Sequence, residues 1–468
     1  MKQSIADKIN RSKTFFYFSV TSVFFILPAI YNGYPLFYSD SAVYIKFAML
    51  IGNINNDSLP YLSGIGYAFF MRLASCKATL WLVIMMQGLI LNLLIYRVLL
   101  EFFPRNKLAY IHFFIILVLV LFSSCGWTAS QLMPDIFTSF LILATFLIYS
   151  ENQKKLAEYI LLSFLIEVSI LSHLSNLTIA ILNIPALIIL FAFRKDFRAS
   201  RKALLSKTIL MIVLISVSVF TMKVLNKKYY NQYVMSPTGH IFLMARLADA
   251  GFMNEFLNER CKEKSYNLCE YKDCFPESYE KFLWDTKGAF YQTGGWDITQ
   301  NQEYKQVIRD VLTTPKYFYL FALNCSDHFL KQTISFRTGD GLYSWFNRES
   351  SQYQIVLENF NKPEIRNSFQ SSKQIRGRLN FKYVNILNDI LLAISLLIII
   401  WCIIKKLTDR KTIQLTYVII SGLLINAVST SAMSSVFDRF QSRVIWLLPF
   451  LACIYIVSRI LPNENLNY

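Results

Sequence analysis

Charged residues are scarce in this sequence of 468 residues. Only 16% of them are Asp, Glu, Lys or Arg, whereas a soluble domain carries about a quarter. Hydrophobic residues make up 54%, and the mean hydropathy is +0.38. Many windows of about 20 residues contain no charge at all. This composition excludes an ordinary soluble domain and predicts a helical protein that crosses a membrane several times.

Motifs of common soluble chemistries are also lacking. The sequence has no zinc-ligand spacing, no glycine-rich phosphate-binding loop and no dinucleotide-binding fingerprint. Its net charge of +17 comes from 47 basic and 30 acidic residues. Because most basic residues lie in short connectors between apolar segments, the excess indicates membrane topology and argues against nucleic acid as a partner.

Hydropathy predicts about ten spanning helices, so the expected fold is an all-α polytopic membrane protein. The predicted spans are 13–32, 78–101, 107–125, 131–150, 158–175, 177–194, 208–226, 384–404, 411–431 and 443–461. No cleavage site of small residues follows the first span, so we interpret it as an uncleaved signal anchor.

The basic connectors assign the two sides of the membrane. They precede the first span and follow the second, fourth, sixth and eighth spans, so alternation places them together and both termini in the cytoplasm. A first outer loop (33–77) and a large loop (227–383) then share the other side, and the large loop is too long for a simple connection. We expect a membrane module (1–226), a mostly helical extracytoplasmic loop domain (227–383) and a second membrane module (384–468). Part of the large loop, 316–336, predicts an amphipathic helix on the membrane face.

Half of the eight cysteines cluster in the large loop, which predicts one or two disulfides in an oxidising compartment. These four are Cys261, Cys269, Cys274 and Cys325. Three complete pairings are possible, and free thiols remain an alternative. Cys76 and Cys125 lie at same-side ends of neighbouring spans and could form another disulfide. The cluster contains no CxxC pair, so no metal site is predicted there.

A single acid follows the first span in "YPLFYSDSAVYIKFAML", residues 34–50. The residues after Asp40 predict a short interfacial helix that would hold its carboxylate at a fixed depth. Such a carboxylate could act as a general base. Aspartate between two serines is also a common helix N-cap, and this alternative stays open. Tyr38 and Tyr44, on either side of Asp40, are candidate substrate-binding residues.

Asp135, in "SQLMPD", is a second acid on the same outer side. Two outer carboxylates from separate loops could support acid/base or metal-assisted group transfer. An acid after proline also suits the first turn of a helix, so a structural role remains open.

Arg439 and Arg443, in "VFDRFQSRVIWLLPF", are four residues apart and should share one helix face. Both are expected at the outer end of the last span, where the positive-inside rule does not explain them. Paired arginines at the mouth of a membrane suit a lipid-linked phosphate or pyrophosphate. Pairing with Asp438, or anchoring at the interface, is the alternative.

Two further features lie on the same outer side. His173, in "LSHLSN", closes a span and is a candidate ligand of the same phosphate, although a lone histidine is more often structural. Residues 59–69, "LPYLSGIGYAF", predict a re-entrant turn that lines a cavity, or an ordinary loop. The loop aromatics Trp284, Trp296, Tyr343 and Trp345 could stack on sugar rings or belong to an interfacial belt.

This arrangement resembles the GT-C superfamily of membrane glycosyltransferases. The resemblance is architectural over most of the chain and rests on motifs only at "YSDSAVYI", at "MPD" and at the arginines near the last outer loop. It implies a polyprenyl-phosphate sugar donor, transfer on the outer face to a glycan or lipid acceptor, and inversion. Asp40 would be the general base, Asp135 a second acid, and Arg439 and Arg443 ligands of the lipid phosphate.

Some features depart from this family. The first loop has one acid in place of an acidic pair, and no clear DxD or ExE follows, which leaves a divalent-cation cofactor unsupported. The segment "GHIFLMARLADAGFMNEFLNERC" is also similar to uncharacterised bacterial membrane proteins, which implies a bacterial inner membrane with a periplasmic large loop. An O-antigen polymerase-like enzyme, suggested by Arg337 in "FRTGDG", and a non-catalytic transporter are the alternatives. A transporter should show two related halves, which we do not find.

Overall fold

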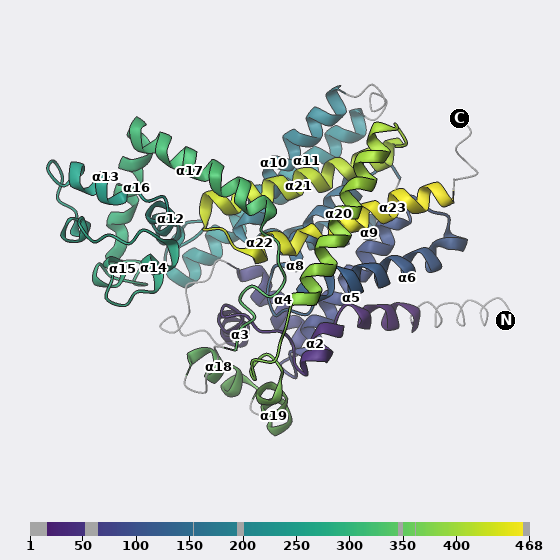
Figure 1. Ribbon diagram of the computed structural model, residues 1–468, viewed down its shortest axis with the longest axis horizontal. Helices are drawn as coiled ribbons and strands as arrows, with labels where there is room; N and C mark the ends of the chain where they lie inside the picture. The colour runs from purple at the N-terminus through teal and green to yellow at the C-terminus, as the bar shows by residue number, and fades with distance from the viewer. Residues whose placement is uncertain are drawn as a thin grey trace.

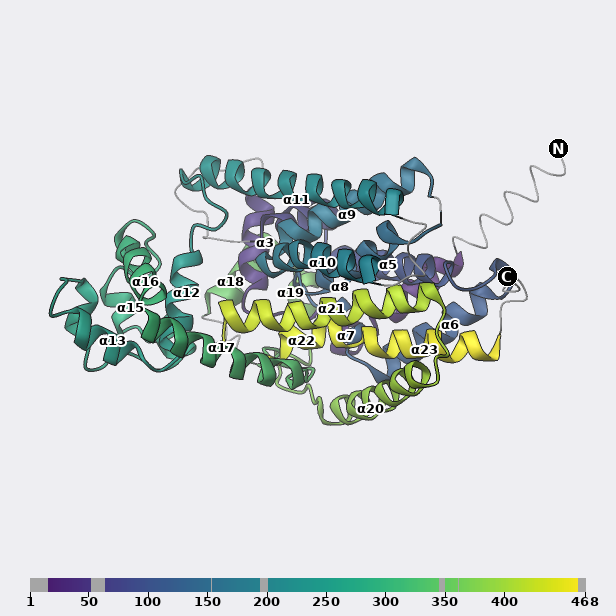
Figure 2. The ribbon, with the colours of Figure 1, turned by 90° about the horizontal axis from the view of Figure 1, so that it is seen from above.

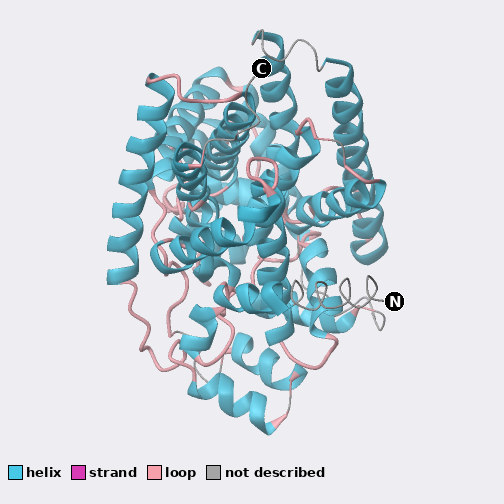
Figure 3. Ribbon diagram, turned by 90° about the vertical axis from the view of Figure 1, so that its right-hand side faces the viewer, coloured by secondary structure: helices cyan, strands magenta, loops and turns pink. Residues whose placement is uncertain are grey.

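The computed structural model describes residues 16–51, 64–152, 154–193, 201–344, 350–360 and 362–461. Within these ranges the chain forms helices joined by loops (Figures 1 and 3). One parallel bridge, between Leu36 and Gln131, is the only strand-like pairing in this part of the chain. The predicted all-helical fold is therefore confirmed for the described residues.

Seven helices of the described residues are long and apolar enough to cross a membrane, and all seven coincide with predicted spans. They are α5 (Trp81–Leu99), α6 (Arg105–Phe122), α10 (Leu174–Phe193), α11 (Arg201–Tyr230), α20 (Lys382–Ile404), α21 (Arg410–Met433) and the run of α22 (Asp438–Ile445) into α23 (Leu447–Ile460). Length and composition thus support a multi-pass membrane protein.

The three remaining predicted spans are helical but shorter. The span expected at 131–150 is α8 (Ile136–Tyr149), and the one at 158–175 is α9 (Leu156–Ser172), with 14 and 17 residues. The span at 13–32 begins outside the described residues. Its described part is helical over 16–24 and again in α2 (Leu27–Asn32), where a proline occupies the first turn. The count of about ten spans stays a prediction.

Long helices run roughly parallel to one another, with α11 at one edge of the bundle and α20 at the other (Figure 2). Apolar side chains on both edge helices are exposed, which suits contact with lipid. The uncharged α8 lies in the interior, packed on α5, α9 and α21, and all its residues are buried. Gly422 allows α21 to approach α8, because a Cβ there would lie 2.8 Å from Ile142 Cδ1.

Basic connectors meet at one end of this bundle, as the topology predicts. Lys154 Nζ lies 3.3 Å from Glu101 Oε1, and Lys411 Nζ donates to the Glu101 carbonyl at 3.1 Å. Arg410 pairs with Glu151 at the same end. The first part of the large loop, residues 239–313, lies at the opposite end, beyond α21 and α22 (Figure 1).

The first part of the large loop has its own hydrophobic core. This part of the loop domain, residues 239–313, contains α12 (Gly239–Ala248), α13 (Met253–Arg260), η3 (Asn267–Tyr271), α14 (Tyr279–Trp284), α15 (Ala289–Gln292), η4 (Gln300–Gln302) and α16 (Glu303–Thr313). Buried aromatics such as Phe256, Phe282 and Phe290 fill its core. Each such side chain contributes about 1.5–3 kcal/mol when it leaves water.

The second part of the large loop returns to the bundle. The helix predicted at 316–336 is α17 (Pro315–Ile334), which packs along α21 and keeps Tyr319, Leu330 and Ile334 exposed. The chain then forms α18 (Ser351–Asn359) and α19 (Pro363–Ser371), whose apolar side chains join the bundle core. The proposed boundaries at 226 and 383 remain predictions.

Three short helices complete the bundle near the first outer loop: α3 (Ser41–Leu50), α4 (Ile65–Ser75) and α7 (Cys125–Ala129). The predicted interfacial helix is α3, which packs on α4 and α18. Of the predicted re-entrant turn, 59–63 lies outside the described residues. Gly64 and Gly66 let α4 approach α9 closely, since a Cβ on Gly66 would lie 2.7 Å from the Val168 carbonyl oxygen.

Candidate active site

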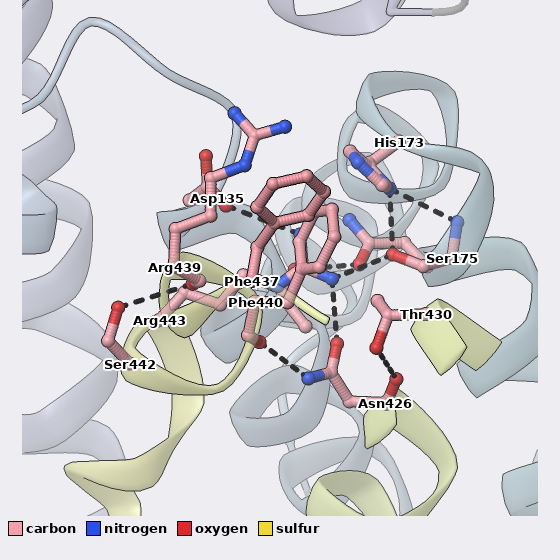
Figure 4. A network of polar contacts seen from close by, with 12 residues as sticks. Asp135, His173, Ser175, Asn426, Thr430, Phe437, Arg439, Phe440, Ser442 and Arg443 are labelled. Atoms are coloured by element: carbon pink, nitrogen blue, oxygen red, sulfur yellow. Dashed lines mark hydrogen bonds and ion pairs between the residues drawn. The ribbon is translucent and has the colours of Figure 1, made fainter. Parts of the chain in front are cut away.

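Two arginines on α22 organise the site. Arg439 and Arg443 lie one helical turn apart, and both guanidinium groups lie against the ring of Phe440, 4.9 and 5.4 Å from its centroid. The Arg443 side chain is fully buried, whereas 19% of the Arg439 side chain is exposed. Arg439 is thus the more exposed of the two arginines, and we call its end of the site the mouth, whereas Arg443 is buried among its polar partners (Figure 4).

Arg443 forms the deep ion pair. Its Nη1 lies 3.3 Å from Asp135 Oδ1, and its Nη2 donates to Ser175 Oγ at 2.9 Å and to Asn426 Oδ1 at 2.7 Å. Asp135 stands immediately before α8, but its side chain forms no capping hydrogen bond. Only 7% of that side chain is exposed. The carboxylate is therefore committed to Arg443.

Arg439 forms the pair at the mouth. Its Nη1 lies 3.4 Å from Asp40 Oδ2, and its guanidinium lies over the Tyr38 ring, 4.2 Å from the centroid. Asp40 occupies the N-cap position of α3 without making a capping hydrogen bond, and Ser39 Oγ donates to its other oxygen at 3.2 Å. Nearly half of its side chain, 47%, is exposed. The Asp40 carboxylate is thus open to solvent and unused by the helix.

Backbone contacts hold the first outer loop beside the segment that carries Asp135. The Leu36 N–H donates to the Ser130 carbonyl at 3.0 Å, and the Leu132 N–H donates to the Leu36 carbonyl at 2.9 Å. The side chain of Gln374 binds the Phe37 backbone and accepts from its N–H at 2.9 Å. These contacts bring two acids from separate loops to the same helix.

Asp340 is a site residue that the sequence reasoning missed. The RTGDG loop (337–341) follows α17, and Asp340 Oδ2 accepts from the Arg439 N–H at 3.2 Å. Burial raises the pKa of this carboxyl, although the N–H and charge of Arg439 oppose that effect. Gly341, at φ +72°, faces the Tyr38 ring so closely that a Cβ would lie 1.5 Å from it. The signal in the sequence that could have identified Asp340 was its position between two glycines of a loop.

The remainder of the large loop fixes the start of α22. The Gln332 side chain accepts from the Phe437 N–H at 3.1 Å and donates to its carbonyl at 2.9 Å. The Arg337 N–H donates to Asp438 Oδ1 at 3.0 Å, while the Arg337 side chain stays exposed. Unpaired N–H groups at a helix start need such acceptors. The loop therefore sets the position of Arg439.

His173 lies between α9 and α10, next to the deep pair. Its Nδ1 contacts Ser175 Oγ at 2.7 Å and the Ser175 N–H at 3.2 Å. Burial, followed by the charges of Arg443 and Arg439, lowers the pKa of His173 well below its usual value. Its ring faces Phe440, with 6.4 Å between centroids. The histidine is therefore neutral and belongs to the same site.

Two tyrosines, Tyr38 and Tyr44, pack beside the charged groups of the site. Tyr44 is 6% exposed and packs edge-on against Tyr67 with ring centroids 5.1 Å apart. A Cβ on Gly64 would lie 2.6 Å from the Tyr44 ring, so this position requires a glycine. Burial raises the pKa of Tyr38 to about 12, which keeps its hydroxyl protonated at neutral pH. Both side chains thus present neutral surfaces beside the charges.

The two arginines retain unused donors. Buried Nε atoms of Arg439 and Arg443 have no hydrogen-bond partner. A buried N–H without an acceptor is unfavourable by about 1–3 kcal/mol, more for a charged group. An oxyanion that entered the site would supply the acceptor that these groups lack.

Residues with metal-binding side chains do not gather here. In the described part of the chain, no group of three or more His, Cys, Asp or Glu side chains could hold a metal ion. Asp40 and Asp135 face arginine side chains, and Asp340 faces a backbone N–H.

One of the predicted disulfides is present, between Cys261 and Cys269. Cys274 and Cys325 are free thiols, so the large loop contains one of the one or two bridges predicted there. The possible disulfide between Cys76 and Cys125 is not formed: both thiols are free, and Cys76 is exposed whereas Cys125 is buried. Similar ends of neighbouring helices did not bring the two thiols together.

The loop aromatics do not line this site as a group. Trp284 and Trp296 pack on each other in the loop domain, with ring centroids 5.6 Å apart. Tyr343 is 62% exposed just after the RTGDG loop, and Trp345 lies outside the described residues. Stacking on a sugar remains a prediction for these side chains.

Comparison with known proteins assigns no relative. The chain matches no protein-family profile, no curated protein and no solved structure. Its function must therefore be inferred from the site.

Proposed function

We propose that this protein is a membrane glycosyltransferase that moves a sugar from a polyprenyl-phosphate-linked donor to a glycan or lipid acceptor. The observation that carries the proposal is the pairing of acids from two separate loops, Asp40 and Asp135, with two arginines on one turn of α22. In the same proposal, the protein lies in a bacterial inner membrane, and the site opens on the periplasmic side.

Asp40 is the base in this proposal. Its carboxylate takes the proton from the acceptor hydroxyl while that oxygen attacks the anomeric carbon of the sugar. The bond from that carbon to the phosphate oxygen breaks, and the lipid phosphate leaves with the bonding electrons. Attack opposite the leaving group inverts the anomeric centre. The 47% exposure of the Asp40 side chain supports access of the acceptor from water.

Arg439 binds the leaving phosphate. Its guanidinium has an unpaired Nε and only one carboxylate at 3.4 Å, so it can accept a second anionic partner. Chemistry outside the cytoplasm has no nucleotide sugar available, so the donor must be carried by the membrane and activated by phosphate. A cation at the mouth stabilises the charge that develops on that phosphate.

The test measures release of lipid phosphate from a panel of polyprenyl-phosphate sugars by the purified protein in lipid nanodiscs. Asp40→Asn, which removes the base, should slow release of lipid phosphate by about 10²–10⁴-fold. The thermal stability of this variant should stay near that of the wild type. Asp327→Asn is the matched control, because Asp327 is an exposed acid paired with Lys331 on α17. Full activity of Asp40→Asn would rule out the base assignment.

A polymerase-like enzyme is the second candidate, favoured by one observation. The exposed Arg337 belongs to the RTGDG loop, whose Asp340 binds Arg439. If Arg337 holds a second lipid-linked glycan as the acceptor, Arg337→Ala should abolish formation of long products together with the lipid phosphate that each of those transfers releases. A transferase of single sugars would be unaffected in product length.

A further inference from the structure

A chain of hydrogen bonds connects the deep ion pair to His173. Arg443 Nη2 donates to Ser175 Oγ at 2.9 Å, so this hydroxyl acts as acceptor toward the arginine. The same oxygen lies 2.7 Å from His173 Nδ1 and can direct its own proton there. Each group therefore passes a hydrogen bond to the next, from the guanidinium to the imidazole (Figure 4).

The geometry determines which ring nitrogen carries the proton. The Ser175 backbone N–H lies 3.2 Å from His173 Nδ1, and an amide N–H can only donate. Nδ1 must then be an acceptor, which places the proton of a neutral ring on Nε2. The second nitrogen points away from Ser175 (Figure 4) and has a hydrogen to offer.

Surrounding charges oppose a second proton on the ring. Arg443 and Arg439 both lie on the Phe440 ring that His173 faces. A histidinium would be a third cation in this space. Asp135, the acid that pairs with Arg443, already has that arginine as its counter-charge. Burial and these two arginines lower the pKa of His173, in agreement with the geometry.

We propose that His173 is a permanently neutral hydrogen-bond donor whose Nε2–H binds a phosphate oxygen of the donor lipid. The Asp135–Arg443–Ser175 chain acts as the positioning device that fixes the tautomer. The identity of the ligand rests on the proposed function, whereas the fixed tautomer does not. A neutral donor can bind the phosphate oxygen without delivering a proton to it.

Nuclear magnetic resonance on isotopically labelled histidine tests the tautomer in the full-length protein in lipid nanodiscs. Only four histidines are present, and His173→Gln identifies the signals of this ring. We expect an unprotonated Nδ1 and a protonated Nε2, with signals unchanged between about pH 5 and pH 8. A protonated Nδ1, or titration within that range, overturns the inference.

Farnesyl phosphate is the probe for the ligand. Binding should shift the His173 Nε2 signal, and His173→Leu should weaken affinity about tenfold to a hundredfold. His328→Gln is the matched control, because His328 lies on α17 away from this chain of bonds. Binding with neither a shift of Nε2 nor an effect of His173→Leu overturns the role of His173 and leaves the proposed function standing. If farnesyl phosphate does not bind, both the phosphate site and this role fail, while the tautomer is judged by the first measurement.

Discussion

Removing the negative charge of the deep pair should destabilise the whole bundle. Asp135→Asn keeps an oxygen toward Arg443 but leaves a fully buried guanidinium without a counter-charge. Breaking a buried pair by removing one partner costs about 3–5 kcal/mol. Ser175 and Asn426 still accept hydrogen bonds from Arg443, so we expect the lower half of that range. In the mouth pair, the Asp40 carboxylate that the substitution changes is about half exposed, and Asp40→Asn should cost about 0–1 kcal/mol.

A double-mutant cycle separates charge from packing. The free energy of unfolding would be measured in mixed micelles for Asp135→Asn, for Arg443→Gln and for both together. Because the double variant buries no unpaired charge, it should be more stable than Asp135→Asn alone. The reasoning is refuted if Asp135→Asn is as stable as the wild type. It is also refuted if adding Arg443→Gln to Asp135→Asn lowers the free energy of unfolding by as much as Arg443→Gln does alone.

Two other predictions concern the RTGDG loop. Gly341→Ala should abolish activity, because its Cβ would overlap the Tyr38 ring. Gly33→Ala is the control: Gly33 has a similar positive φ but nothing within 4 Å of an added Cβ, so the substitution should cost only about 1–2 kcal/mol of stability. A thermal melt and the lipid-phosphate assay compare the two variants. Asp340 has a raised pKa in the folded state, so its contribution to stability is full below the pKa of the unfolded chain and is lost as pH rises. Asp340→Asn should therefore gain in melting temperature relative to the wild type as pH rises from about 4 to 7, and a constant difference across that range would contradict this.

Local patterns predicted the parts of the site that depend on one segment. Apolar runs located the seven long helices, and a spacing of four placed Arg439 and Arg443 on the same face of α22. Placing basic connectors on one side implied that Asp40 and Asp135 share the other. The convergence of these four side chains was thus within reach of topology alone.

Partners that arrive from distant segments were beyond such reasoning. Ser175 and Asn426 bind Arg443 across 268 and 17 residues, and no periodicity specifies either contact. Asn426 did carry a signal, since an amide within an apolar span needs a partner. For Asp40 and Asp135, only the structure could distinguish a helix cap from an ion pair. Both roles place the same residue at the same position in the sequence.

The two ion pairs differ in burial, and this difference indicates different roles for them. The deep pair is closed to solvent, and Nη1 and Nη2 of its arginine meet three acceptors, so it can hold α22, α8, α10 and α21 together but has little freedom to meet a substrate. The mouth pair has an exposed carboxylate and an arginine with an unused donor. A reactive group must be accessible to the substrate and must be held in a fixed position by its neighbours. Asp135 is therefore better explained as a positioning residue, and the reactive carboxylate in this proposal is Asp40.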